Sequence, residues 1–83
     1  MLTCCIILHG DLPDLVRGRR ETERRLPVPT SLEDAIEALG IPHTEFDRLT
    51  RDGAPAAPGD LVRDDATVEV WPTRPYDLDD PRF

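Results

Sequence analysis

The chain has 83 residues, with ten arginines, no lysine, 17 acidic residues and a formal net charge of −7. A chain this short forms one domain and buries only about 60% of the surface of its unfolded form, so its core must be small. The longest apolar stretch is far shorter than the ~18 residues of a membrane span, and the N-terminus lacks the features of a secretory signal. We therefore expect a globular cytoplasmic protein with no membrane partner.

The first predicted element is a strand over residues 2–9, which closes at Gly10. It is apolar on both faces, as is typical of a strand in the middle of a sheet. The adjacent Cys4 and Cys5 must point to opposite faces, which favours two small buried or half-buried side chains over a disulfide. Because only two histidines could join them as ligands, neither a metal nor another cofactor is expected.

A loop or single helical turn over residues 11–16 and a hairpin turn near Gly18 lead to a second strand over residues 21–28. Its polar side chains and Pro27 indicate an edge strand. This hairpin holds five of the ten arginines: Arg17, Arg19, Arg20, Arg24 and Arg25. They either keep the strand edge from pairing with another chain or contact RNA phosphates or an acidic partner. The overall negative charge argues against a general nucleic-acid coat, and no DNA partner is expected.

Residues 30–39 predict a helix. Thr30 or Ser31 can cap its N-terminus, with an acidic residue three positions later. One face of the helix is apolar at i, i+3, i+4 and i+7. These residues are Leu32, Ala35, Ile36 and Leu39. Gly40 favours a left-handed residue after the last turn, and Pro42 prevents continuation.

The second half of the chain predicts three more strands. A connector over residues 41–45, with room for a short turn, leads to a strand over residues 46–51. Here Phe46, Arg48 and Thr50 alternate with Asp47 and Leu49. Asp52-Gly53 is a tight-turn signal, and residues 54–57 form at most a stub strand because Pro55 interrupts them. After a loop over residues 61–66, residues 67–71 form the last strand, which Pro72 ends.

The order is therefore strand, strand, helix, strand, stub strand, strand. Two hairpins joined by one crossover helix place the first and last strands side by side and parallel in the middle of a mixed sheet. This predicts an α+β, ubiquitin-like β-grasp domain over residues 1–72, with a four- to five-stranded sheet packed on one helix. Residues 73–83, rich in proline and acidic residues, are predicted to form a tail or linker towards a following domain.

Three segments carry a resemblance to a known family: residues 34–45, the Asp52-Gly53 turn, and residues 61–72. Together they are similar to the ubiquitin-like domain that is fused to the Mut-7 C-terminal RNase domain in bacteria, and more broadly to the MoaD and ThiS sulfur carriers. The resemblance implies a PIN-like RNase domain as partner, in the same chain or another. Pro81-Arg82-Phe83 is similar to the segment that opens that RNase domain.

Many proteins with this fold act through a flexible Gly-Gly tail, but residues 73–83 contain no glycine. The absence of lysine also means that no isopeptide can form on the side chains. We therefore expect a non-conjugating interaction or regulatory module for the RNase, with Trp71 and the exposed sheet face as its recognition surface. The alternatives are a MoaD/ThiS-like carrier for molybdopterin or thiamine synthesis, and an RNA-binding accessory domain that uses the arginine-rich hairpin.

His43, Thr44 and Glu45 are the residues best suited to acid–base chemistry, because an imidazole beside a carboxylate can transfer protons near neutral pH. They also follow a helix end, where Thr44 can cap a short turn and His43 can bond to backbone carbonyls. No nucleophile, oxyanion donor or glycine-rich phosphate loop accompanies them. Enzymatic activity is therefore not expected of this domain.

Overall fold

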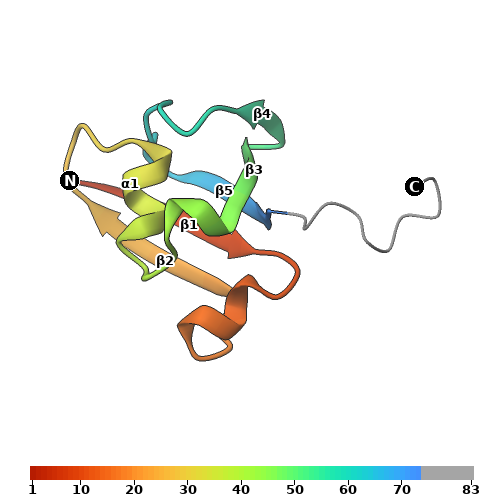
Figure 1. The fold of residues 1–83 in the computed structure, drawn as a ribbon. Helices are drawn as coiled ribbons and strands as arrows, with labels where there is room; N and C mark the ends of the chain where they lie inside the picture. The colour runs from red at the N-terminus through yellow and green to blue at the C-terminus, as the bar shows by residue number, and fades with distance from the viewer. Residues whose placement is uncertain (74–83) are drawn as a thin grey trace.

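A mixed sheet of five strands, with an α-helix packed across one face, makes up the part of the chain that the computed structural model describes, residues 1–73 (Figure 1). The strands are β1 (Leu2–Leu8), β2 (Glu21–Leu26), β3 (Phe46–Arg51), β4 (Ala54–Ala56) and β5 (Ala66–Pro72). The helices are α1 (Leu32–Glu37) and the short 3-10 helices η1 (Leu12–Val16) and η2 (His43–Glu45). The predicted tail beyond Thr73, with its Pro81-Arg82-Phe83 segment, lies outside the described residues.

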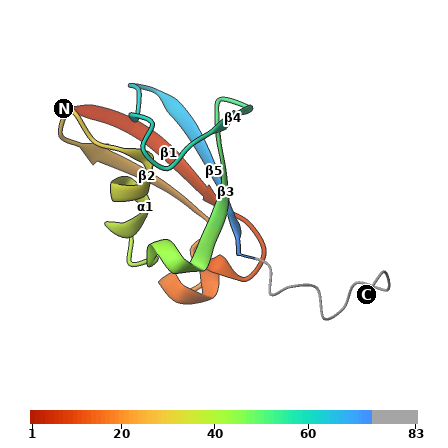
Figure 2. The same cartoon turned by 45° about the horizontal axis from the view of Figure 1, so that its top comes forward.

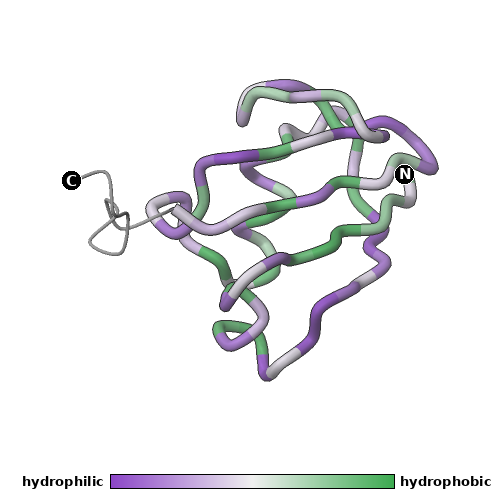
Figure 3. Tube along the Cα trace, turned by 90° about the vertical axis from the view of Figure 1, so that its right-hand side faces the viewer, coloured by the Kyte–Doolittle hydropathy of each residue, from purple (hydrophilic) through white to green (hydrophobic). Residues whose placement is uncertain are grey.

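The strand order β2-β1-β5-β3-β4 puts the first and last strands next to each other at the centre of the sheet. β1 and β5 run parallel, and the other neighbouring pairs are antiparallel. β2 lies at an edge, as its polar sequence and Pro27 predict. In Figure 3 the tube of β2 is accordingly mostly hydrophilic, whereas that of β1 is largely hydrophobic. The predicted ubiquitin-like β-grasp fold is confirmed.

The core lies between α1 and the sheet, and alternation along the two central strands fills it. Side chains of β1 and β5 that face α1 are almost completely buried, whereas their neighbours in sequence are half-buried on the opposite face. The buried set in these two strands comprises Leu2, Cys4, Ile6, Leu8, Ala66, Val68 and Val70. From α1, Leu32, Ala35 and Ile36 complete the core, as their spacing predicts.

The helix is shorter than predicted, because its regular hydrogen bonding ends at Glu37. Ser31, and not Thr30, is the N-cap, and its Oγ accepts a hydrogen bond from the Asp34 N–H at 3.1 Å. Leu39 still packs against the core from the turn that follows, and Gly40 has the expected positive φ, of 104°.

Strict alternation in β3 is a wrong prediction. Phe46 and Leu49 are both buried although three positions separate them, and the register with β5 shifts between Phe46 and Arg48. The extra residue, Asp47, forms a β-bulge that turns both apolar side chains to the core. Simple alternation from Leu49 would put Phe46 on the face of the sheet opposite to the core, and the bulge turns it to the core instead.

Strand ends also differ from the prediction. β2 stops at Leu26, before Pro27, and β5 includes Pro72, which pairs with Phe46. A proline fits here because it needs to donate no ladder hydrogen bond at the end of a strand. The Thr73 N–H then donates to the Glu45 carbonyl at 2.9 Å, which extends the contact between the end of β5 and η2. In residues 1–73, none of the helices has the length and apolar character needed to cross a membrane.

Candidate functional site

The sheet has one face covered by helices and one face that nothing covers among residues 1–73. Figure 2 shows α1 and both 3-10 helices on the same side of the sheet. On the other side, which we call the open face, the central strands present side chains that are only half-buried. These are Thr3, Cys5, Ile7 and His9 from the β1 side and Thr67, Glu69 and Trp71 from β5.

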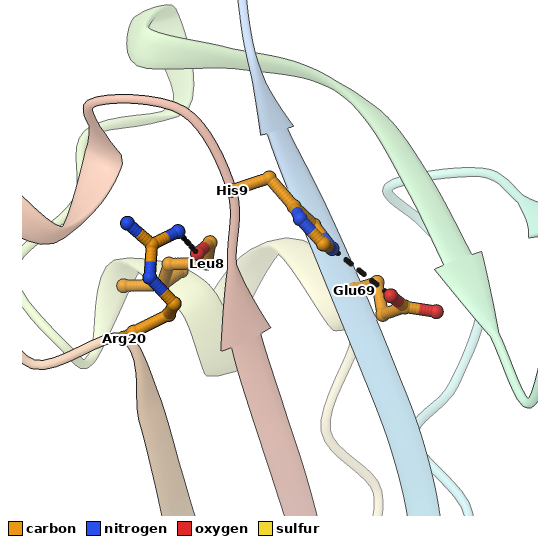
Figure 4. A network of polar contacts seen from close by, with 4 residues as sticks. All are labelled: Leu8, His9, Arg20 and Glu69. Atoms are coloured by element: carbon orange, nitrogen blue, oxygen red, sulfur yellow. Dashed lines mark hydrogen bonds and ion pairs between the residues drawn. The ribbon is translucent and has the colours of Figure 1, made fainter.

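Four open-face side chains at the end of the sheet contact one another in a row, which we call the Trp71 ladder. The indole of Trp71 stacks on the imidazole of His9, with ring centroids 4.4 Å apart and planes 7° from parallel. The guanidinium carbon of Arg48 lies 4.5 Å from the centre of the Trp71 ring. His9 Nε2 is 2.9 Å from Glu69 Oε1 (Figure 4).

The sheet register creates this row. Trp71 pairs with Arg48 across β5 and β3, whereas Glu69 pairs with Ile7 across the parallel ladder of β5 and β1. His9 follows β1 and donates its backbone N–H to the Val70 carbonyl at 2.9 Å, which holds it beside β5. Side chains from β3, from β5 and from the residue after β1 therefore meet, although these three segments are distant in sequence.

The contacts within the ladder order an aromatic and charged surface. A guanidinium over an indole contributes about 0.5–1 kcal/mol at an exposed site and more once water is removed. The hydrogen bond to Glu69 restricts the His9 ring, so the stacked aromatic surface is held in place before a partner arrives. A groove of about 520 Å³ lies beside it, lined by Asp47, Arg48, Trp71 and Pro72.

The structure separates the five arginines that the sequence places in one hairpin. Arg24 lies opposite Cys4 on the helix side of β2, whereas Arg25 lies opposite Thr3 on the open face. Neighbouring strand residues point to opposite faces, so these two cannot act together. Arg20 is engaged within the fold, since its Nη1 donates to the Leu8 carbonyl at 3.0 Å (Figure 4).

The remaining members of the hairpin cluster stay together. Arg17 and Arg19, from the turn after η1, line one cavity with Arg24, on the helix side of the sheet. The arginine-rich hairpin thus presents one group of three arginines and two separate arginines, not a continuous basic surface.

His43 lies apart from the ladder, in η2. Its Nδ1 is 3.0 Å from Glu37 Oε2 of α1, so it bonds to a carboxylate and not to the backbone carbonyl that we expected. The expectation that Thr44 caps a turn is also wrong, because the N-cap of η2 is Pro42 and no side chain caps it. The Thr44 carbonyl instead accepts a hydrogen bond from Thr73 Oγ1 at 3.2 Å.

Glu33, one helical turn before Glu37, completes a small surface group with His43. One atom able to bind a metal ion, a carboxylate oxygen or an imidazole nitrogen, from each of the three residues lies within 4.8 Å of the other two. The His43 side chain is 65% exposed and that of Glu37 is 35% exposed. The geometry is that of a hydrogen-bonded link between α1 and η2, with solvent around it.

The two cysteines are free thiols, as predicted, with Cys4 buried in the core and Cys5 half-buried on the open face. Burial raises the pKa of the Cys4 thiol. Burial also raises the pKa of Cys5, and so do a hydrogen bond from its Sγ to Glu21 Oε1 at 3.4 Å and the negative charge of that carboxylate. Both thiols therefore stay protonated at neutral pH, which is unfavourable for nucleophilic chemistry.

The sequence singled out Trp71 as a candidate binding residue, but not His9, Glu69 and Arg48, which the structure brings into one row with it. Period-two alternation does place Glu69 and Trp71 on the same face, and this signal could have been used. The positions of His9 and Arg48 depend on the parallel register and on the β3 bulge, neither of which the sequence alone specifies.

The strand order and the packing of α1 define the class: the domain has the fold of a small ubiquitin-like β-grasp protein. A family model described as Mut7-C ubiquitin matches residues 2–76, and the chain belongs to this family. Among curated proteins, no sequence matches it.

Two solved structures illustrate the similarity of fold. The small archaeal modifier protein 1 of H. volcanii superposes with a TM-score of 0.72 at 18% identity, covering 89% of this chain and 100% of that one. A putative molybdopterin converting factor, subunit 1, from Pyrococcus furiosus gives a TM-score of 0.69 at 18% identity, with 89% and 100% coverage. At this identity the similarity concerns the fold alone.

Proposed function

We propose that this domain is a non-conjugating, ubiquitin-like interaction module that binds and regulates a PIN-like RNase domain of the Mut-7 C-terminal type, in the same chain or another. In this proposal the RNase domain is the enzyme and the β-grasp domain acts by recognition. The observation that carries the proposal is the Trp71 ladder on the open face. The family membership supports the choice of partner.

Several physical features of the ladder suit a binding hot spot. Tryptophan and arginine are the residue types most enriched where binding energy concentrates, and Trp71 and Arg48 are already in contact. The row ends in a cation at one side and a carboxylate at the other, which would fix the orientation of a partner through complementary charges. Because the ladder is ordered by its internal contacts, binding would lose little side-chain entropy.

Co-purification with a recombinant Mut-7 C-terminal RNase domain tests the proposal. We expect the two to co-elute, and we expect Trp71→Ala to weaken the interaction by about 2 kcal/mol or more, roughly 30-fold, since it removes the centre of the ladder. Leu15→Ala is the matched control, because Leu15 is a large apolar residue that is 48% exposed and lies in η1, on the helix side.

Two results would contradict the proposal. One is the absence of any complex between the folded domain and the RNase domain. The other is equal binding by wild type and Trp71→Ala, which would place the contact elsewhere on the domain.

A sulfur carrier is the second candidate, and the fold shared with the Pyrococcus furiosus protein is the observation in its favour. Its chemistry requires a flexible Gly-Gly end, and no Gly-Gly pair occurs in the 83 residues. We expect the mass of the protein to stay unchanged after incubation with ATP, a sulfur donor and an adenylating enzyme of the MoaD/ThiS system. A terminal thiocarboxylate would favour the carrier instead.

A further inference from the structure

A cavity of about 300 Å³ lies on the helix side of the sheet, between the end of η1, β2 and the end of α1. Three arginines contribute its charge, Arg17, Arg19 and Arg24, and Thr22 adds a hydroxyl group. The rest of its wall is apolar and consists of Val16, Ala38 and Leu39. It lies on the side of the sheet opposite to the Trp71 ladder.

The positive charge in this cavity is not neutralised within residues 1–73. The ion pairs of this part of the chain involve His9 and His43, and none involves an arginine. The Nε of Arg24 is buried and has no hydrogen-bond partner. A buried donor without a partner costs about 1–3 kcal/mol, and more when the group is charged. The guanidinium of Arg24 therefore lines the cavity with hydrogen-bonding capacity that residues 1–73 do not use in full.

The backbone at Arg17 gives an independent indication. Arg17 ends η1 in the left-handed conformation, with φ of 60° and ψ of 33°. For a side chain other than glycine or asparagine this conformation costs about 1–2 kcal/mol. Because Arg17 is held in this strained conformation at the wall of a cavity, it is a candidate for a binding role.

We propose that this cavity binds a phosphate monoester, of the kind that a nucleotide or the phosphorylated end of an RNA chain presents. A phosphate monoester carries a charge of about −1.5 to −2 and three acceptor oxygens. Three forked guanidinium groups match this pattern better than they match a single carboxylate. The apolar wall contacts the carbon skeleton of the ligand next to the phosphate.

The size of the site and the charge of the chain favour an end group over a long nucleic-acid track. The cavity volume is at the lower end of the range for small-molecule sites. An extended nucleic-acid backbone would also lie along acidic surfaces of the domain, because the net charge of the chain is −7. Repulsion between its phosphates and these surfaces would weaken the binding of such a backbone. This inference does not depend on the proposed RNase partner or on the ladder.

The test is an NMR titration of the isotope-labelled protein with AMP, adenosine and inorganic phosphate. We expect AMP to shift the backbone amide signals of Thr22, Ala38 and Leu39, adenosine to leave them in place, and inorganic phosphate to compete with AMP. A short RNA with a 5′-phosphate should bind more tightly than AMP if the ligand is an RNA end. Equal affinity for both indicates a free nucleotide.

Variants distinguish a specific binding site from a general electrostatic attraction between the arginines and the phosphate. Arg17→Gln and Arg19→Gln, both at exposed positions, should each weaken AMP binding about tenfold, since each removes one charged hydrogen bond. Arg25→Gln removes the same charge on the open face and should change the affinity less than twofold; circular dichroism checks that all three variants are folded.

Three results would overturn the proposal. They are equal shifts with AMP and adenosine, equal losses in Arg25→Gln and Arg19→Gln, and no shift around the cavity at millimolar AMP.

Discussion

Gly10 shows how closely two segments approach at the end of the sheet. It has a φ of +61°, and a Cβ on it would lie 2.8 Å from Cγ of Pro72. Gly10→Ala should therefore lower the free energy of unfolding by about 2 kcal/mol or more, from backbone strain together with the clash. Urea denaturation measures the change.

Two other glycines serve as controls for this prediction. Gly53 also has a positive φ, of +84°, but a Cβ there meets nothing within 4 Å, so Gly53→Ala should show the strain alone, about 1 kcal/mol. Gly59→Ala has neither cost and should be close to neutral. If Gly10→Ala and Gly53→Ala were equally destabilising, the contact with Pro72 would contribute nothing.

Cys5 gives a prediction that depends on pH. Burial raises its pKa first, and the hydrogen bond and charge of Glu21 raise it further. Glu21→Gln removes the carboxylate charge, so the pKa should fall, the thiolate fraction at pH 8 should increase, and alkylation by iodoacetamide should become about 2–5 times faster. Mass spectrometry of the labelled peptides measures this rate.

Glu45→Gln is the matched control for this experiment, because Glu45 lies in η2, away from Cys5. Cys4 should react slowly in every variant, since it is buried. An unchanged or slower rate at Cys5 in Glu21→Gln would show that Glu21 does not hold the pKa of this thiol up.

At the scale of elements, the start of α1 depends on one side chain. Ser31→Ala removes the acceptor of the Asp34 N–H and should cost about 1 kcal/mol in thermal or urea denaturation. Ser31→Asp keeps an acceptor at the same place and should retain most of the stability. Equal losses in both variants would mean that the cap does not stabilise this helix.

The sequence predicted which elements exist better than it predicted how they fit together. The N-cap residue locates the start of the helix segment, and Gly40 and Pro42 locate its end. Asp52-Gly53 locates a hairpin turn in which both residues have positive φ. The β3 bulge was missed because Phe46 and Leu49 fit no simple period, and only their common burial reveals the extra residue. The same bulge sets the place of Arg48 in the ladder.

At the scale of the whole molecule, the parallel pairing of β1 and β5 determines what the surface offers. The order of elements predicts this topology, because a crossover helix must return the chain beside its first strand. The register does not follow from the order, and it is the register that unites His9, Glu69 and Trp71. Alternation along β2 separates Arg24 from Arg25, so the two faces of the domain present different chemistry.

Our central claim is that the Trp71 ladder is the surface by which this domain binds an RNase domain. Trp71 is the single tryptophan of the chain, so incorporation of 5-fluorotryptophan gives one fluorine NMR signal. We expect this signal to shift or broaden when an unlabelled Mut-7 C-terminal RNase domain is added, because a partner would remove water from the indole. The claim would be contradicted if the complex formed at a saturating concentration of the RNase domain and the fluorine signal of Trp71 stayed unchanged.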